Sequence, residues 1–345
     1  MLRNWLPFEE PLIVLEQKIA ELKGLEEEQD VDRGAEIAAL EEQALEVKKR
    51  IFADLSPWDK VQLARHPRRP YTLDYLRLIC DDFVELHGDR RFGDDGAIVA
   101  TLARIGGRTV AAIGQERGRT TRERQKRNFG SPHPEGYRKA VRVMKLAEKL
   151  GHPVVTLIDT SGAACLEEDE SRGISEAIAS AMLEMSRLRV PIVCVVIGEG
   201  GSGGAIGIGV GDRILMLEYS TYSVIAPEGC AAIIWRESSR AAEAARLLRV
   251  TAEEAVALGV ADGVIPEPLG GAHRDCMGTA ENIKAAVLKA LDELCALPVE
   301  TLLSQRYQKY RNMGLTAESK ATKPAQGAAS ANASKPKRGR RNAKR

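Results

Sequence analysis

Apolar side chains recur at helical spacing over roughly the first fifty residues of the chain. They lie three or four positions apart in two stretches, at Leu12, Leu15, Ile19 and Leu22 and at Ile37, Leu40, Ala44, Val47 and Ile51. This spacing predicts two amphipathic helices, and the polar stretch 26–34 between them predicts an antiparallel hairpin. The apolar seam of the hairpin could meet another subunit or its own core, and the pattern leaves both interpretations open.

The pattern changes after residue 56. From Pro57 to Pro70 the chain is broken by prolines and basic residues, and residues 71–86 are predicted to form another helix. Further on, short apolar runs alternate with helical segments, of which 135–150 and 175–188 are good examples. Strands are predicted at residues 97–105, 109–114, 154–158, 192–197, 213–217 and 223–225. We therefore expect an α/β domain built from repeated β-β-α or β-α units.

Three of the predicted strand ends carry unusual residues, at 159–162, 198–204 and 226–230. Ligand sites in α/β folds gather at such turns, which converge at one edge of the sheet. The segment 198–204 is the most informative, because five of its seven residues are glycine. Glycine exposes the backbone N–H groups, and the apolar segment 205–210 that follows predicts the first turns of a buried helix. Together they predict an oxyanion-binding turn, although a turn selected only for packing is the simpler alternative for an isolated glycine-rich loop.

Two nucleotide-binding motifs are poor matches to this segment. No Lys-Ser or Lys-Thr pair follows the glycines, so the phosphate-binding P-loop pattern fails. Gly198, Gly200 and Gly203 match the dinucleotide-binding spacing, but the acidic residue expected about 20 positions later would be Glu218, which lies in a strand context.

Composition narrows the class of protein. The chain has 345 residues, of which 44% are hydrophobic and 29% charged, enough for one large domain with appendages. Its apolar runs are far shorter than the ~20 residues that span a bilayer, and the N-terminus lacks the features of a signal peptide. We therefore expect a cytoplasmic protein. The six cysteines form no C-x-x-C pair, which argues against a zinc ribbon or a disulfide framework.

The formal net charge of +1 is unevenly distributed. Residues 319–345 hold nine Lys or Arg and no acidic residue, so the rest of the chain carries +1 − 9 = −8. The tail has almost nothing to bury and is predicted to be disordered. We favour a solvated terminus over an electrostatic contact with nucleic acid or an acidic partner.

Long stretches of the sequence resemble one family, the carboxyltransferase alpha subunit of multi-subunit bacterial acetyl-CoA carboxylase. The resemblance covers roughly residues 6–314. It is carried by the runs 51–55 (IFADL), 62–67 (QLARHP), 69–75 (RPYTLDY), 127–130 (RNFG), 134–140 (PEGYRKA), 197–205 (IGEGGSGGA), 219–225 (YSTYSVI) and 266–273 (PEPLGGAH).

The resemblance implies a crotonase-like fold, a spiral of β-β-α units, and a reaction that moves a carboxyl group from carboxybiotin to acetyl-CoA, giving malonyl-CoA for fatty-acid synthesis. Gly203 and Gly204 would form the oxyanion hole for the biotin ureido oxygen. The substrate-binding residues would be Gly200, Gly201, Ser202, Gly162, Ala163, Glu228, Gly229 and Arg127. The implied domains are an N-terminal helical hairpin (1–55), the carboxyltransferase domain (56–316) and the basic tail (317–345).

The resemblance also implies partners. The oxyanion hole for the thioester would come from a separate beta subunit, so the chain would supply half of an active site in an alpha2-beta2 assembly. Biotin carboxylase and the biotin carboxyl carrier protein would complete the system. No cofactor would be bound covalently here, and zinc is expected only in the four-cysteine ribbon of the beta subunit, with no metal site in this chain.

One loop departs from the family pattern. The family usually reads Asp-Thr-Pro-Gly-Ala-Tyr-Pro-Gly where this chain has Asp-Thr-Ser-Gly-Ala-Ala-Cys-Leu at 159–166. Because two prolines and a glycine are missing, we expect a loop that is more mobile or differently shaped, with consequences for biotin docking.

Other residues suggest competing chemistry. Glu199 and Glu228 could act as acid and base of a hydratase, Ser202 with His273 and Asp159 could form a hydrolase triad, and the basic run 117–127 could meet the phosphates of CoA or an acidic carrier. Three function classes therefore stay open: a carboxyltransferase subunit for acetyl-CoA or another acyl-CoA, a self-contained hydratase or hydrolase, and a non-catalytic assembly subunit.

Overall fold

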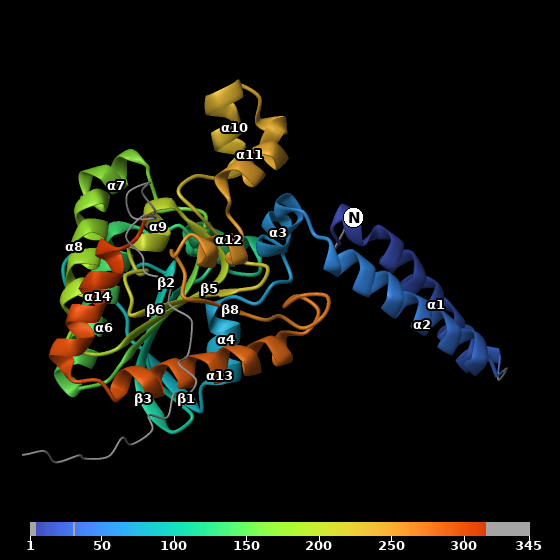
Figure 1. Cartoon of the computed structure of the whole chain (residues 1–345), viewed down its shortest axis with the longest axis horizontal. Coiled ribbons are helices and arrows are strands. Elements are labelled where there is room, and N and C mark those ends of the chain that lie inside the picture. Colours follow the sequence, from blue (N-terminus) through green and yellow to red (C-terminus); the bar gives the residue numbers. More distant parts are fainter. Residues whose placement is uncertain (1–4, 30–31, 315–345) are drawn as a thin grey trace, which may run out of the picture. The chain divides into compact units, whose positions relative to one another are not determined.

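A computed structural model describes residues 5–29 and 32–314, and Figure 1 shows the arrangement of its elements. The basic tail (317–345) lies outside the described residues, and with it the prediction of its disorder. The predicted domain boundaries at residues 55 and 316 stay predictions. No described helix combines the length and apolar character needed to cross a bilayer.

The core is one mixed sheet in the order β1-β2-β3-β4-β5-β6-β8, with β7 paired to the end of β5. β1 to β3 are antiparallel neighbours, and every pairing from β3 onward is parallel. The strands are β1 Asp82–Glu85, β2 Ile98–Ile105, β3 Arg108–Gln115, β4 Val154–Thr160, β5 Ile192–Gly201, β6 Arg213–Leu217, β7 Thr221–Ser223 and β8 Gly263–Ile265. All residues of β4 and β5 are buried, as expected of parallel strands covered on both faces.

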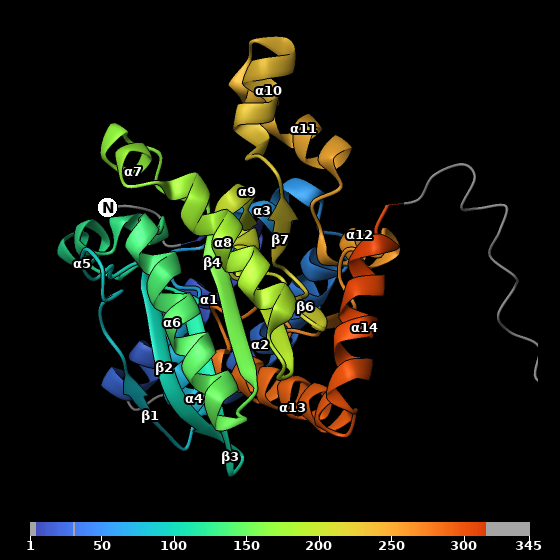
Figure 2. The same ribbon diagram turned by 90° about the vertical axis from the view of Figure 1, so that its left-hand side faces the viewer.

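Helices cover both faces of the sheet. α6 (Pro134–Leu150) and α8 (Ile174–Arg187) pack on one face, as Figure 2 shows, and bury Tyr137, Met144 and Met185 in its main apolar cluster. α4 (Thr72–Ile79) and α13 (Cys276–Cys295) contribute to the second cluster, on the other face. The remaining helices are η1 Pro7–Glu9, α3 Pro57–Ala64, α5 Thr121–Lys126, η2 Asn128–Gly130, α7 Glu167–Ser171, α9 Ser202–Ile206, α10 Pro227–Trp235, η3 Ser238–Arg240, α11 Ala241–Leu248, α12 Ala252–Ala257 and α14 Val299–Arg311.

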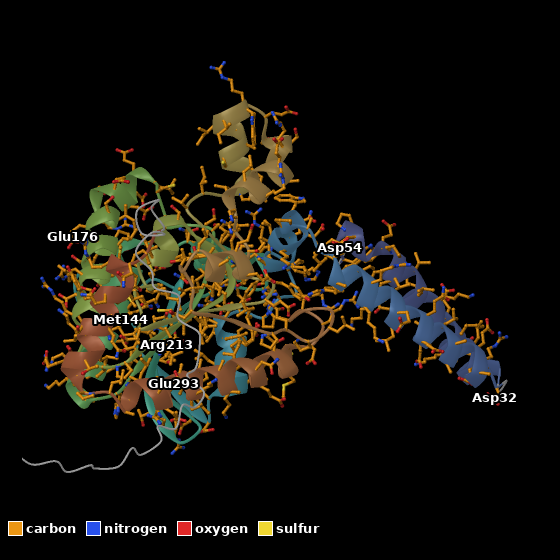
Figure 3. All side chains as sticks on the ribbon, in the orientation of Figure 1. Asp32, Asp54, Met144, Glu176, Arg213 and Glu293 are labelled. Atoms are coloured by element: carbon orange, nitrogen blue, oxygen red, sulfur yellow. The ribbon has the colours of Figure 1, made fainter. Side chains whose placement is uncertain are left out.

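The predicted N-terminal hairpin is present. α1 (Glu10–Gln29) and α2 (Gly34–Ala53) lie side by side, with Asp32 at the turn and Asp54 at the opposite end of the pair (Figure 3). The apolar seam between them buries Leu22, Ile37 and Ala44. The connection is shorter than the polar stretch 26–34 suggested, because α1 continues to Gln29.

The prediction of a single helix over residues 71–86 is wrong. α4 ends at Ile79, and residues 82–85 form β1, which pairs with β2 in register from Asp82 opposite Arg104. The ladder to β2 provides backbone hydrogen bonds that a longer helix would forgo, so tertiary pairing overrides the local helical pattern.

The segment 57–70 contains a helix despite its prolines. α3 begins at Pro57, where the fixed φ of proline suits the first helical position. Ser56 and Asp59 cap it reciprocally: the Asp59 N–H donates to Ser56 Oγ (3.2 Å), and the Ser56 N–H donates to Asp59 Oδ2 (3.0 Å). This capping box is readable in the sequence Ser-Pro-Trp-Asp.

The glycine-rich segment also differs from its prediction. β5 continues to Gly201, because residues 199–201 pair with residues 221–223 of β7, which is shifted two residues from the predicted strand. The helix that follows, α9, spans only Ser202–Ile206 instead of continuing to residue 210. The turn is therefore confined to the junction of Gly201 and Ser202, and the first glycines are strand residues.

Candidate active site

The sharp junction between β5 and α9 is made by Ser202. Its φ of +51° lies in the left-handed region, which residues other than glycine rarely adopt. Its side chain is exposed. Gly203 is half-buried and Gly204 is buried behind it. The first N–H groups of a helix have no carbonyl partner within the helix, so those of Gly203 and Gly204 belong to the donors that this junction presents.

The glycines of this junction are required by close packing. A Cβ on Gly204 would lie 2.6 Å from the carbonyl carbon of Gly162 and 2.7 Å from the nitrogen of Ala163. A Cβ on Gly201 would lie 2.3 Å from the carbonyl oxygen of Ser161, which is closer than real Cβ atoms approach other atoms. The loop after β4 thus lies directly on the turn, and the structure brings together Gly162, Ala163 and Gly204.

Gln115 and Tyr137 anchor the other side of the turn. Gln115 Nε2 (3.1 Å) and the Tyr137 hydroxyl (3.2 Å) both donate to the Gly204 carbonyl. Gln115 Oε1 in turn accepts the Asp159 N–H (3.0 Å). One buried side chain at the end of β3 therefore links the end of β4 to the start of α9.

The loop that departs from the family pattern begins with an internal hydrogen-bonded turn. The Thr160 hydroxyl donates to the Gly162 carbonyl (2.7 Å), and its oxygen accepts the Gly162 N–H (3.1 Å). The Ala164 N–H donates to the Pro132 carbonyl (3.0 Å). The expected mobility of this loop stays a prediction.

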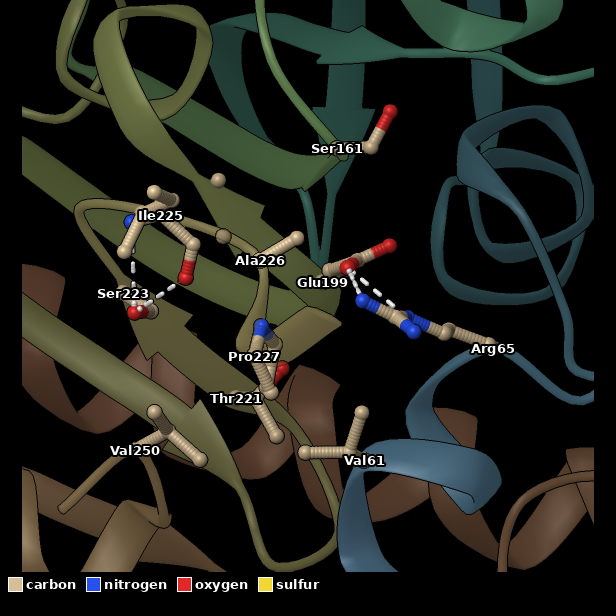
Figure 4. A pocket seen from close by; sticks show the side chains of 12 residues that line it. Val61, Arg65, Ser161, Glu199, Thr221, Ser223, Ile225, Ala226, Pro227 and Val250 are labelled. Atoms are coloured by element: carbon tan, nitrogen blue, oxygen red, sulfur yellow. Dashed lines mark hydrogen bonds and ion pairs between the residues drawn. The ribbon is translucent and has the colours of Figure 1, made fainter. Parts of the chain in front are cut away.

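A network of two arginines and three carboxylates lies beside the turn, and Figure 4 shows one of its contacts, between Arg65 and Glu199. Arg65 donates through Nε to Glu199 Oε1 (2.8 Å) and through one terminal nitrogen to Glu228 Oε1 (2.6 Å). Arg117 lies within 3.0 Å of both Glu199 Oε2 and Asp159 Oδ1. Asp159 Oδ1 also accepts the Glu199 N–H (3.0 Å).

The network shifts the pKa values of Arg65, Arg117, Asp159 and Glu228. Burial opposes the charge of Arg65, but Glu199 and Glu228 outweigh it and raise its pKa, and the pKa of Arg117 is raised in the same way by Asp159 and Glu199. Burial raises the pKa of Asp159 although Arg117 acts in the opposite direction. For Glu228, burial also favours the neutral form, yet the hydrogen bond from Arg65 holds its pKa below the ordinary value.

These contacts bear on the hydratase interpretation. A glutamate that serves as general acid or base must exchange protons with a substrate. Glu199 and Glu228 instead accept hydrogen bonds from Arg65, and Glu199 accepts another from Arg117 (3.0 Å). This arrangement favours a structural role for both carboxylates.

The proposed hydrolase triad is not assembled in the described residues. His273 contacts Glu9 through Nε2 (3.3 Å) and stacks on His66, whereas Asp159 contacts Arg117 and Glu199. No hydrogen bond joins Ser202 to either His273 or Asp159 within residues 5–29 and 32–314.

The other predicted site residues are spread more widely. Glu228 and Gly229 lie in the first turn of α10, and Glu228 is tied to the turn through Arg65. Arg127 follows α5 and donates to the Gly96 carbonyl (2.8 Å), so no contact links it to the glycine turn among the described residues. Of the basic run 117–127, Arg117 belongs to the site itself, and Arg119 stacks over the Tyr71 ring (4.1 Å).

Glu9, His66 and His273 form a buried group whose ligand-type atoms lie within 4.8 Å of one another. The imidazole rings stack with centroids 4.0 Å apart, and His66 Nδ1 accepts the Arg68 N–H (3.2 Å). Arg274 already occupies Glu9 Oε1 through Nε (3.1 Å). The two imidazole rings stack on each other, and a guanidinium already binds the carboxylate. These contacts favour a hydrogen-bonded cluster that secures the base of the hairpin over a metal centre.

Two hollows flank the turn. A small one of about 10 Å³ lies beside Arg65, Glu199 and Gly200, and Figure 4 shows its lining. A larger cavity of about 480 Å³ opens beside Ser202 and Gly203, and most of its lining is apolar, including Ile206, Val210 and Tyr222. Small-molecule sites typically combine an apolar cavity of this size with a few polar groups, and backbone N–H groups of the turn would supply them here.

Sequence reasoning missed Arg65, Arg117 as an internal ion-pair partner, and Gln115. Arg117 belongs to the basic run 117–127, for which the sequence suggests contacts with phosphates or an acidic carrier, and Gln115 follows an apolar strand with nothing to distinguish it. Their positions follow from long-range contacts between segments 40 or more residues apart, which local patterns do not encode.

The chain is similar to known proteins in both sequence and structure. A family model described as acetyl co-enzyme A carboxylase carboxyltransferase-like matches residues 5–314. The alpha subunit of acetyl-coenzyme A carboxylase carboxyl transferase from Vibrio cholerae is 53% identical over 314 residues, covering 90% of this chain and 98% of the relative. The corresponding subunit from Geobacillus kaustophilus is 52% identical, with 90% and 95% covered.

The fold is similar to those of a solved transcarboxylase and a solved malonate decarboxylase. The transcarboxylase 12S structure matches with a TM-score of 0.55 and 19% identity, covering 67% of this chain and 43% of that chain. A Pseudomonas malonate decarboxylase hetero-tetramer matches with a TM-score of 0.53 and 16% identity, covering 67% and 89%. At such identity these structures establish the crotonase-like fold alone, and the chain spans less than half of the transcarboxylase chain.

Proposed function

Since the chain belongs to the alpha-subunit family of the acetyl-CoA carboxylase carboxyltransferase, we propose that it transfers the carboxyl group of carboxybiotin to acetyl-CoA, giving malonyl-CoA. The observation that carries this proposal is the glycine turn at the start of α9. Gly201 and Gly204 touch the backbone of the preceding loop so closely that only glycine fits. Such packing holds backbone donors in place before the reaction, which is how an oxyanion hole lowers a barrier.

The chemistry requires two sets of donors. Carboxybiotin supplies the carboxyl group, and its departure develops negative charge on the ureido oxygen, while proton loss from acetyl-CoA develops charge on the thioester oxygen. We assign the N–H groups of Gly203 and Gly204 to the ureido oxygen. Removing one such donor typically costs about 2.7–4 kcal/mol of transition-state stabilisation, so a rigid backbone turn is effective.

The larger cavity fits the biotin side of the reaction. Its lining combines the backbone of Ser202 and Gly203 with apolar side chains such as Ile206 and Tyr222. A compact ring system with one polar edge would place that edge at the turn and its apolar body in the cavity, whose volume of about 480 Å³ falls in the range of ligand sites.

The second donor set is proposed to come from a separate beta subunit, and the complete enzyme to be an alpha2-beta2 assembly served by biotin carboxylase and the biotin carrier protein. Zinc would belong to the beta subunit. Because the acyl pocket would be shared with that subunit, another acyl-CoA such as propionyl-CoA is the alternative substrate. The arginine-bound Glu199 and Glu228 disfavour the hydratase alternative.

The test measures biotin-dependent decarboxylation of malonyl-CoA, the reverse reaction, with purified subunits. We expect no activity from this chain alone and activity when a family beta subunit is added. In Gly204→Ala the new Cβ would displace the 162–163 backbone, so kcat should fall about 10²- to 10³-fold. In the matched Gly263→Ala variant the Cβ meets only Leu215 Cδ2 at 3.4 Å, and activity should be retained.

The outcomes separate the three function classes. Activity from the chain alone would show a self-contained active site and overturn the proposal of a site shared with a beta subunit. A verified complex with no activity would indicate an assembly subunit. Equal activity of Gly204→Ala and Gly263→Ala would leave the carboxyltransferase assignment but remove the glycine turn from it.

A further inference from the structure

Arg65 connects two parts of the site that are distant in sequence. It caps the C-terminal end of α3, and its guanidinium bridges Glu199, the residue before Gly200, and Glu228, in the first turn of α10. The second contact to Glu199 is a terminal nitrogen at 2.7 Å from Oε1. Three segments from different regions of the chain, α3, β5 and α10, therefore meet on one side chain.

The two carboxylates depend on Arg65 to different degrees. Glu199 has a second cation, because Arg117 donates to its Oε2 (3.0 Å), and its side chain is only 10% exposed. The Glu228 side chain is 41% exposed, and within the described residues its ion pair is with Arg65. Loss of Arg65 would leave Glu199 partly neutralised but would release Glu228 and the start of α10 from the turn.

A displacement at Glu199 reaches the glycine turn directly. Residues 199–201 form the ladder to residues 221–223 of β7, and a Cβ on Gly200 would lie 2.4 Å from the Tyr222 ring. Because the backbone continues from this ladder into Ser202 and α9 without a flexible linker, its register sets the positions of the next N–H groups.

We propose that Arg65 is a positioning residue for the oxyanion-binding turn. By holding Glu199 and Glu228 together, it fixes the end of β5 and the start of α10 so that the Gly203 and Gly204 N–H groups stay aligned with the developing charge. Its planar guanidinium can bind two carboxylates at once, which the ammonium group of lysine cannot do with the same geometry. The inference rests on the proposed carboxyltransferase function.

The experiment uses the complex reconstituted with a beta subunit and compares Arg65→Gln, Arg65→Lys and Glu228→Gln. The matched control is Lys60→Gln, which removes the ion pair of the same helix α3 to Glu253 (2.8 Å) away from the turn. For each complex, kcat and the KM values for malonyl-CoA and biotin are measured in the decarboxylation assay, with thermal unfolding and subunit assembly recorded alongside.

For Arg65→Gln we expect kcat to fall about 10- to 100-fold, because small misplacements of aligned groups carry losses of that size. The KM for malonyl-CoA should stay within about twofold of the wild-type value, since we propose that this substrate binds in the half of the site that the beta subunit supplies. Arg65→Lys should recover only a small part of kcat. Lys60→Gln should match the wild type, and the double variant Arg65→Gln/Glu228→Gln should be no worse than Arg65→Gln alone, because residues acting as a unit are non-additive.

Several results would overturn the inference. An unchanged kcat in Arg65→Gln, an equal loss in Lys60→Gln, or a loss that appears only as a raised malonyl-CoA KM would each do so. Should Arg65→Gln fail to assemble, Glu228→Gln decides, because it keeps Arg65 on Glu199: we expect a kcat loss of about tenfold, and an unchanged kcat refutes the role. An inactive wild-type complex would refute the proposed function instead, so the two failures are distinguishable.

Discussion

The buried carboxylate of Glu9 shows how single contacts secure the base of the N-terminal hairpin. Its Oε2 accepts the Leu6 N–H (2.9 Å), while Oε1 lies near His273 Nε2 (3.3 Å) and Arg274 Nε (3.1 Å). Burial alone would raise its pKa, but the hydrogen bonds of His273 and Leu6 and the charge of Arg274 lower it from 4.5 to about 2. The folded chain therefore stabilises the ionised form of Glu9.

This depressed pKa predicts a pH-dependent stability difference between the wild type and Glu9→Gln. A lowered pKa means that the carboxylate stabilises the fold fully above its unfolded pKa of 4.5, and that this contribution is lost as the pH falls toward about 2. The wild type should exceed Glu9→Gln by about 3 kcal/mol in free energy of unfolding at pH 7, since each pKa unit corresponds to about 1.36 kcal/mol. Urea unfolding at several pH values measures the difference.

Glu16→Gln is the matched control, because Glu16 contacts the same Arg274 (2.7 Å) with a side chain that is 40% exposed. Exposed ion pairs of this kind contribute about 0–1 kcal/mol to the free energy of unfolding, so Glu16→Gln should be nearly as stable as the wild type. A difference between the wild type and Glu9→Gln that stayed constant from pH 7 to pH 3 would contradict the assignment.

At the level of single residues, the sequence was most informative about the glycines. Their density after an apolar strand predicted backbone donors at a sharp junction, and the structure places Gly204 on Gly162 and Ala163. The ionic partners were not predictable. Whether a charged side chain is solvated or paired depends on which distant segment it meets, and Arg65 meets residues 134 and 163 positions away.

Among the elements, α14 is attached to the sheet by one buried arginine. Arg306 binds both carboxylate oxygens of Asp212 (2.8 and 2.7 Å), and its remaining donors reach the carbonyls of Met185, Leu188 and Val190. Both side chains are almost fully buried. A buried ion pair satisfied this completely is costly to break from one side, because the remaining charge has no partner.

We therefore predict that Arg306→Met lowers the free energy of unfolding by about 3–5 kcal/mol, although the two side chains are similar in length. Asp212 would be left buried without its ion-pair partner, and the carbonyls of Met185, Leu188 and Val190 would lose donors. Glu300→Gln on the same helix removes only an exposed pair with Arg189 (2.8 Å), and should cost less than about 1 kcal/mol. Equal urea midpoints for the two variants would show that Arg306 does not secure α14.

Elements were predictable where periodicity and burial agreed. β6 was predicted at its observed bounds, and α6 and α8 within one residue at each end, because each has one clear apolar pattern. The failures lie where a distant strand decides the structure: residues 82–85 join the sheet through β2, and residues 199–201 stay extended because β7 pairs with them. Local sequence carries no information about either partner.

On the scale of the whole molecule, the parallel half of the sheet brings the site together. β4 and β5 are adjacent and parallel, so Asp159 at the end of one and Glu199 near the end of the other lie at the same edge. β7 extends that edge and leads into α10, which carries Glu228. The sequence allowed us to predict this convergence of the three strand ends, but not the arginines that hold it.

The charge of the molecule is divided between the net −8 of residues 1–318 and the nine basic residues of 319–345. A solvated tail should contribute nothing to the carboxyltransferase site, so a chain ending at residue 318 should assemble with the beta subunit and retain wild-type decarboxylation activity.

Contacts with nucleic acid made by such a tail would be purely electrostatic, and binding would weaken steeply between 50 and 200 mM salt as counterions are released. A full-length variant with the nine basic residues replaced by glutamine separates charge from length. DNA binding that survives 200 mM salt in the full chain and disappears in both variants, or loss of activity on truncation, would show that the tail has a specific partner.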